Sequence, residues 1–221
     1  MNPVIRHTSI ATFLVVLLLA GSCDESPTET LFRAEPLLPL AIGNEWTFHT
    51  TYYDSLGNVT AQMPGDTVRI IADTLIDGKR WYYRHYLGHL VGFRNSEMGT
   101  LIRLVSANTD GISRVLFENP TAIGHKYDYP EVTFSGSKAW LSQGGHVATV
   151  GAYDTSATVP AGSFRCLLYS VAASPSWSEY RRDFFVAPGD GWIRTDFHAR
   201  VRPGGQIYKL RSDQLTSLTK L

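Results

Sequence analysis

Cysteine is scarce in this chain, and neither sign of charge is in excess. Of the 221 residues only Cys23 and Cys166 are cysteines, so a fold held together by a disulfide framework is excluded. The 20 basic residues balance the 20 acidic ones. This balance gives no electrostatic basis for binding nucleic acid or an anionic membrane surface. We therefore expect no nucleic-acid partner.

Long apolar runs are also lacking. The longest, Ile10–Ala20, has no charged residue and would span about 16 Å as a helix, against about 30 Å for the hydrocarbon core of a bilayer. Arg6 precedes this run, and small residues follow it as far as Cys23. A charged start, a short apolar run and a small-residue cleavage site are typical of a signal peptide. The sequence therefore predicts export.

The segment Leu19-Ala20-Gly21-Ser22-Cys23 resembles the lipobox of bacterial lipoproteins. The resemblance implies that Cys23 receives a diacylglyceryl group and becomes the first residue of the mature chain. The alternative is an ordinary secretory peptide that is cut near Ala20 to Ser22 and leaves the Cys23 thiol free. On the first interpretation the protein is lipid-anchored in the bacterial cell envelope, with the outer membrane or cell surface favoured.

Three segments follow from this interpretation. Residues 1–22 are expected to be the signal peptide, residues 23–36 a flexible acidic tether, and residues 37–221 a single β domain. The tether is polar and has no hydrophobic period. With Cys23 lipidated, Cys166 has no partner within the chain. Its neighbours read as a strand, so we expect a small buried thiol rather than a nucleophile.

Convincing helical periodicity is absent, and alternation with period two dominates instead. Trp46 and Phe48 alternate with Thr47 and His49, and Asp77-Gly78 between two such runs is a hairpin signal. The predicted fold is all-β, a single antiparallel meander curled into a half-barrel, barrel or sandwich. At the end of the chain, Leu215 and Leu218 stand three apart and suggest a final helical turn.

Further strands are expected wherever alternating or β-branched residues lie between turn residues. Their ranges are 66–74, 79–87, 100–106, 112–117, 129–134, 138–142, 146–151, 156–159, 164–172, 179–186, 192–201 and 206–210.

Four phrases in order resemble uncharacterised secreted proteins and lipoproteins of Bacteroidetes-like bacteria. They are PLAIGNEWTF from Pro39, DTLIDGKRWYY from Asp73, TVPAGSF from Thr158 and FVAPGDGW from Phe185. The resemblance implies an envelope location and a mostly β fold. It brings no catalytic residues.

Complete catalytic motifs are lacking. No Gly-x-Ser-x-Gly is present, and Ser135 and Lys138 have the spacing of Ser-x-x-Lys enzymes but no companion motifs. His85 and His89 are interpreted as one strand, which would hold them about 13 Å apart, too far to share a metal. Asp196 and His198, two apart on a strand, could form an acid–base or metal pair. A solvated sheet face predicts the same pattern.

Aromatic residues are abundant, at 12% of the chain. They are expected either to pack the core or to line a cavity for lipid or sugar. The candidate ligand-binding residues are Trp46, Trp81, Trp140 and Trp192. We therefore expect a non-catalytic binding or structural module, for an apolar ligand, a glycan or an envelope protein, that reaches the membrane through its N-terminal lipid. The alternative is an envelope hydrolase with an Asp/His site near residues 183–198. No metal and no cofactor are expected.

Overall fold

The computed structural model describes residues 35–105, 112–119, 122–135, 138–142, 144–173, 180–200 and 206–221. Cys23 lies outside these residues. The described part of the chain forms fifteen strands in three antiparallel sheets and contains no helix. No helix there is long and apolar enough to cross a membrane. The predicted fold class, an all-β antiparallel fold, is confirmed.

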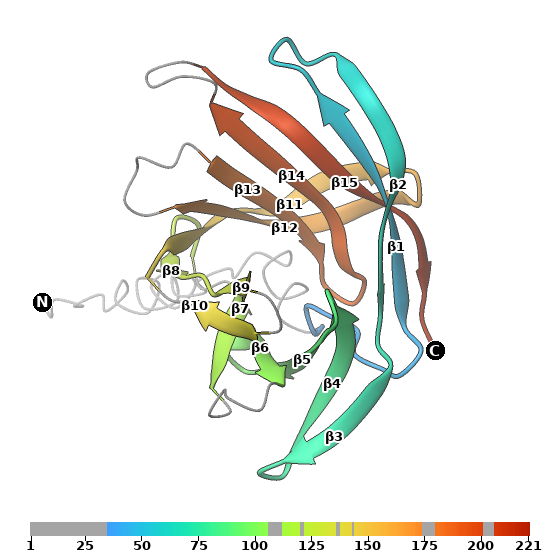
Figure 1. The fold of residues 1–221 in the computed structure, drawn as a ribbon, viewed down its shortest axis with the longest axis vertical. Coiled ribbons are helices and arrows are strands. Elements are labelled where there is room, and N and C mark those ends of the chain that lie inside the picture. Colours follow the sequence, from blue (N-terminus) through green and yellow to red (C-terminus); the bar gives the residue numbers. More distant parts are fainter. Residues whose placement is uncertain are drawn as a thin grey trace, which may run out of the picture.

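An eight-stranded sheet forms the larger part of the molecule and curves strongly (Figure 1). Its order is β2-β1-β15-β14-β13-β12-β11-β8, so the sheet is open, with β2 and β8 at its edges. The strands are β1 (Glu45–Tyr53), β2 (Val59–Arg69), β8 (Lys126–Asp128), β11 (His146–Val159), β12 (Gly162–Ala173), β13 (Tyr180–Ala187), β14 (Gly191–Arg200) and β15 (Ile207–Thr219). The first strand, β1, therefore pairs with the last, β15.

A five-stranded meander and a separate hairpin complete the fold. The meander comprises β3 (Ala72–Ile76), β4 (Lys79–Tyr86), β5 (His89–Ser96), β6 (Gly99–Val105) and β7 (Ser113–Glu118). The hairpin comprises β9 (Glu131–Ser135) and β10 (Lys138–Ser142). The meander contacts the eight-stranded sheet where β2 meets β4, and the hairpin contacts β6. The two larger sheets thus enclose a common interior (Figure 1).

The chain passes from the first large sheet to the second between two adjacent residues. Ile70 exchanges backbone hydrogen bonds with Gly43 and Asn44, before β1, whereas the Ile71 N–H donates to the carbonyl of Tyr83 in β4. The sequence predicted one strand over residues 66–74. The structure divides this segment into β2 and β3, because a β-branched run can pair with either neighbour and sequence alone does not mark the change of partner.

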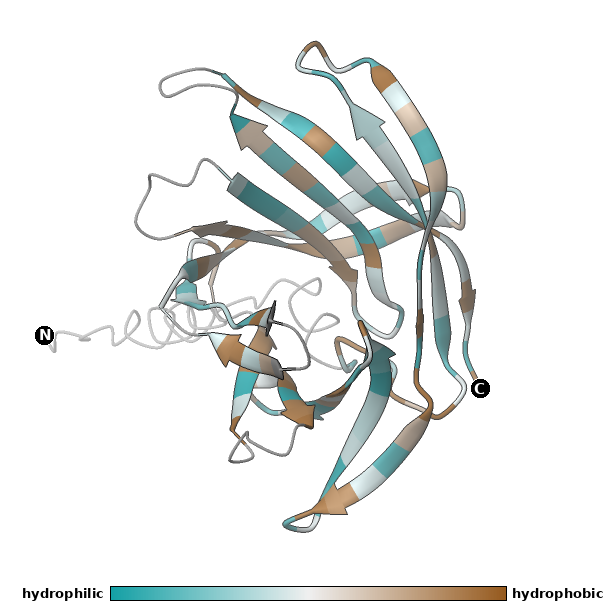
Figure 2. Ribbon diagram, viewed as in Figure 1, coloured by the Kyte–Doolittle hydropathy of each residue, from teal (hydrophilic) through white to brown (hydrophobic). Residues whose placement is uncertain are grey.

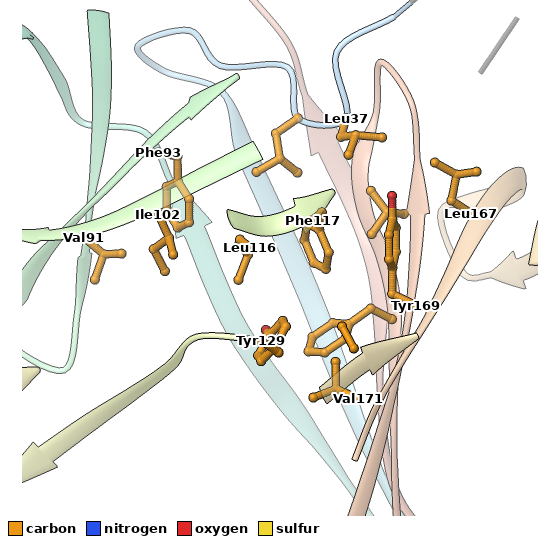
Figure 3. Packing of buried hydrophobic residues seen from close by; sticks show 14 of the residues in the cluster. Leu37, Val91, Phe93, Ile102, Leu116, Phe117, Tyr129, Leu167, Tyr169 and Val171 are labelled. Atoms are coloured by element: carbon orange, nitrogen blue, oxygen red, sulfur yellow. The ribbon is translucent and has the colours of Figure 1, made fainter. Parts of the chain in front are cut away.

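The main core lies between the two large sheets. Val91, Phe93 and Ile102 from the meander face Tyr169 and Val171 from β12 (Figure 3). Hydrophobic and hydrophilic residues alternate along the strands, as expected for sheets with one buried face (Figure 2). A second cluster surrounds Trp46, and a small third cluster contains Trp81, Tyr83 and Leu101.

Two local expectations were wrong. Residues 212–219 belong to β15 and form no helical turn. His85 and His89 do not share a strand, because Leu87 and Gly88 form a tight turn between β4 and β5. Both turn residues have positive φ, 48° and 80°, as a type I′ hairpin turn requires.

Candidate functional site

A cavity of about 400 Å³ is lined by residues of both large sheets. Most of its lining is apolar: Phe48, Val68, Tyr86, Val91, Phe93, Ile102, Leu116, Tyr129, Pro130, Val132, Phe184, Trp192 and Phe197. The polar lining consists of Asp66, Arg84, Glu131, Arg182, Thr195, Arg211 and Asp213. This volume and this mixture are typical of small-molecule sites.

Strand register determines which meander residues reach the cavity. Arg84 lies opposite Val91, and Phe93 lies opposite Ile102. Side chains directly opposite each other point to the same face of a sheet, and so do residues two apart on one strand. The four residues therefore form one side of the cavity wall, with the cation beside the aliphatic surface.

Aromatic rings make up much of the opposite wall. The Trp192 ring packs edge-on against Phe93, with centroids 5.5 Å apart, and Phe184 stacks on Tyr129 at 5.7 Å. Burial raises the pKa of Tyr129 to about 12. The charge of Arg182 lowers this pKa and that of Glu131 raises it, both by smaller amounts. This phenol therefore stays neutral at physiological pH.

Two arginines of the eight-stranded sheet have close carboxylate partners. Arg182 donates to Glu131 Oε1 at 3.0 Å, and Arg211 donates to Asp213 Oδ2 at 2.9 Å. Both lie opposite Phe197 on the intervening strand, and the Arg211 guanidinium stacks 3.7 Å from the centroid of that ring. Charge-assisted hydrogen bonds of this kind neutralise the two cations.

The third arginine of the cavity, Arg84, comes from the meander. Its side chain is only 14% exposed, and its carboxylate partner is Asp66, at 3.8 Å. Its guanidinium carbon also lies 4.7 Å from the centroid of the Tyr86 ring. Burial lowers the pKa of Arg84, and the charge of Asp66 opposes this effect only in part.

The four candidate tryptophans occupy different places. Trp192 lines the cavity. Trp46 is fully buried behind it, with ring centroids 5.9 Å apart, and its indole N–H donates to the carbonyl of Asp190 at 2.6 Å. Trp140 lies on β10 and is 40% exposed. Neither Trp46 nor Trp140 is among the cavity-lining residues.

The fourth, Trp81, lies on the face of the meander that points away from the cavity. It is separated by one residue from Tyr83 and belongs with it to the third cluster. The guanidinium groups of Arg94 and Arg103 lie 5.4 and 5.1 Å from the centroid of its indole ring. This tryptophan is therefore covered by two cations and does not reach the interior between the sheets.

Asp183, Asp196 and His198 come together, but on the face opposite the cavity. Asp183 lies opposite Asp196, while their neighbours Phe184 and Phe197 line the cavity. His198 Nε2 is 3.0 Å from Asp183 Oδ2. The sequence suggested an Asp196–His198 pair, whereas the structure places His198 against Asp183, at the back of the cavity wall.

Hydrogen bonds and ion pairs hold Asp183 in place. Its Oδ1 accepts from Ser170 Oγ at 2.7 Å, and its Oδ2 accepts from Arg181 at 2.9 Å. Burial alone would raise the pKa of Asp183, but His198, Ser170 and Arg181 together hold it below the ordinary value of 3.8. Both Ser170 and His198 lie against this carboxylate. A serine triad instead needs the histidine between serine and carboxylate.

Asp196 is held in a similar way. Its Oδ1 accepts from Ser212 Oγ at 2.6 Å, and its Oδ2 lies 2.9 Å from Lys209 Nζ. Among the residues that the structure describes, no group of three or more His, Cys, Asp or Glu side chains could hold a metal ion. The arrangement is that of a buried polar row across a sheet, in which both carboxylates have partners.

Sequence reasoning did not single out the charged residues of the cavity. Arg84 lies within KRWYYRHY, where aromatic residues occupy both alternating faces of β4. No polar face is therefore visible in that stretch, and the inward direction of Arg84 leaves no signal in the sequence.

The chain matches no protein-family model and no curated protein sequence. One similar solved structure is that of a Parabacteroides distasonis protein provisionally named a lipoprotein. It has a TM-score of 0.39 and 11% identity, covering 84% of this chain and 99% of that chain. Another is a Bacteroides fragilis protein provisionally named an exported protein with a YmcC-like fold. Its TM-score is 0.39 with 10% identity, covering 85% of this chain and all of that one.

Proposed function

We propose that this protein is a cell-envelope lipoprotein that binds a small ligand with an apolar body in the cavity between its two large sheets, without chemical turnover. The observation that carries this proposal is the cavity of about 400 Å³, whose wall is mostly aliphatic and aromatic. Ligand sites commonly have volumes of about 300–1,000 Å³ and a few fixed polar groups in an otherwise apolar lining.

The chemistry of the wall supports binding rather than catalysis. Arg182 and Arg211 are occupied by carboxylates, and Tyr129 is held as a neutral phenol. The Asp183 and His198 pair, which a hydrolase would need in its cleft, faces the other way. An apolar ligand gains from leaving water for such a wall at about 25 cal/mol per Å² of buried surface.

Export and anchoring are the second part of the proposal, and they rest on the sequence. The apolar run Ile10–Ala20 and the lipobox-like segment before Cys23 support a lipid-bearing N-terminus. Residues 23–36 would then tether the β domain to the membrane within about 50 Å, since an extended chain advances about 3.4 Å per residue. A cavity held at that distance suits capture of a ligand near the membrane.

The test compares two neighbouring residues of β7. Leu116 lines the cavity, whereas Val115 packs against the third cluster on the other side of the meander. Titration calorimetry with 1-decanol, on full-length protein carrying Cys23→Ala, should detect binding. Leu116→Phe fills part of the cavity and should weaken binding about tenfold, the effect of losing roughly 1.4 kcal/mol.

Val115→Phe is the control and should leave the affinity for 1-decanol unchanged. Trp192 fluorescence should respond to the ligand, and Trp192→Phe should remove that response. If 1-decanol failed to bind, or if Leu116→Phe and Val115→Phe had equal effects on binding, the cavity would not be the site.

A further inference from the structure

The three arginines of the cavity differ in how well their charge is matched. Arg182 and Arg211 each donate to a carboxylate at 3.0 Å or less. Arg84 has its charged partner, Asp66, at 3.8 Å, and that carboxylate is 64% exposed to solvent. A water-exposed ion pair at that distance contributes little. Arg84 is therefore the cavity cation whose charge the described residues leave least neutralised.

The surroundings of Arg84 make this mismatch costly. Its side chain is 14% exposed and lies against the rings of Tyr86 and Phe93, and its Nε is buried without a hydrogen-bond partner. The Nε atoms of Arg182 and Arg211 are also buried without a hydrogen-bond partner, but a terminal nitrogen of each of these arginines donates to a carboxylate. A buried guanidinium is stabilised best by a planar anion that accepts two parallel hydrogen bonds.

The cavity volume also bears on the size of the ligand's apolar part. A cavity of about 400 Å³ is near the lower end of the range for small-molecule sites, which suits an alkyl chain of medium length. Val91 lies directly opposite Arg84 on the same face of the meander, so the aliphatic wall begins beside the cation.

We propose that the cavity binds a medium-chain fatty acid, with its carboxylate on Arg84 and its alkyl chain along Val91 and Phe93. The proposal rests on the binding function proposed above and adds the ligand class and the residue that recognises its head. The guanidinium supplies two N–H donors to the carboxylate, and the apolar wall takes the chain out of water.

The experiment compares two ligands with the same chain and different heads, sodium decanoate and 1-decanol, by calorimetry at neutral pH on full-length Cys23→Ala protein. Decanoate should bind at least about tenfold more tightly, because its hydrogen bonds to Arg84 are charge-assisted. Arg84→Met should weaken decanoate binding at least about tenfold, and by a clearly larger factor than it changes the binding of 1-decanol. Arg84→Lys, which keeps the charge but not the planar fork, should give an intermediate loss.

Arg94→Met is the matched control, because Arg94 also stacks on an aromatic ring of the meander but on the face away from the cavity. It should change neither affinity. Equal binding of decanoate and 1-decanol to the unmodified cavity would overturn the carboxylate assignment and leave the proposed function standing. Tighter binding of decyl phosphate than of decanoate would also overturn it. Failure of every ligand to bind would overturn both proposals.

Discussion

Cys166 lies on β12 and is fully buried among residues of the second cluster, as the sequence predicted. Its thiol is 3.9 Å from the carbonyl of Phe164. Burial raises the pKa of this thiol from 9.0 to about 12, an effect that the nearby Arg194 opposes only in part. Since the thiolate is the reactive form, Cys166 is chemically inert in the folded protein.

We expect an aromatic disulfide reagent to label Cys166 slowly at neutral pH in Cys23→Ala protein, and rapidly after denaturation. The raised pKa also has a stability consequence. The folded state holds the proton more tightly than the unfolded state, so this contribution is complete below about pH 9 and is lost as the pH rises toward 12. Alkaline unfolding curves should therefore be less steep in Cys166→Ala. Rapid labelling of the native protein would contradict the structure.

The turns of the meander show what could and could not be predicted from sequence at the scale of an element. Asp77-Gly78 and Leu87-Gly88 have nearly the same backbone, with φ of 51° and 70° in the first and 48° and 80° in the second. The first was predicted as a hairpin turn. The second was missed because leucine rarely adopts positive φ, so the residues before it were interpreted as a longer strand. For the same reason β5 was missed.

The last strand shows a different limit. Leu218 lies opposite Trp46 and Leu215 lies opposite Phe48, because a bulge at Thr216 lets two residues three apart share one face. Without the bulge, that spacing is the signature of a helix. The spacing therefore pointed correctly to one shared face for Leu215 and Leu218, but it suggested a helix where the structure has a bulged strand. A bulge depends on the partner strand, which local periodicity does not reveal.

Gly99 begins β6 beside the end of β7, with φ of 125°. A β-carbon there would lie 2.0 Å from the backbone oxygen of Phe117. One of the two strands would have to move to relieve this clash. We expect Gly99→Ala to destabilise the fold by about 2 kcal/mol or more, measured by urea unfolding.

Gly78→Ala is the control, because its φ of 70° imposes backbone strain but no atom lies within 4 Å of the added carbon. It should cost only about 1–2 kcal/mol, the price of the left-handed conformation. Equal losses for the two variants would mean that the close approach of β6 and β7 is not rigid.

At the scale of the whole molecule, the all-β class was predictable because alternation of period two runs through most of the chain. The site was predicted less well. Of the four candidate tryptophans Trp192 lines the cavity, while Trp81 lies on the other face of the meander. Strands with aromatic residues on both faces do not reveal which face is buried. That choice is made by the packing of the two sheets, which joins residues far apart in the sequence.

The anchoring prediction concerns the part of the chain outside the described residues. We expect the mature protein to begin at Cys23 and to carry lipid, because the preceding residues resemble a lipobox. Each buried methylene contributes about 0.8 kcal/mol, so two or more acyl chains anchor a protein stably. Cys23→Ala should move the protein from the membrane fraction to the soluble fraction and abolish incorporation of labelled fatty acid. A variant that stayed membrane-bound and labelled would refute lipidation at this cysteine.

The pairing of β1 with β15 determines when the protein can fold. The hydroxyl of Thr216 donates to the carbonyl of Thr47 across 169 residues of sequence, and the N–H of Leu221 donates to Asn44 across 177. Contacts this distant in sequence make folding slow, because a long loop must close before they form. In a chain that emerges N-terminus first, β1 can pair early with β2 but has to wait for β15, which follows the other seven strands of its sheet. The eight-stranded sheet is therefore completed only after β15 has emerged, and until then one edge of β1 lacks its partner strand.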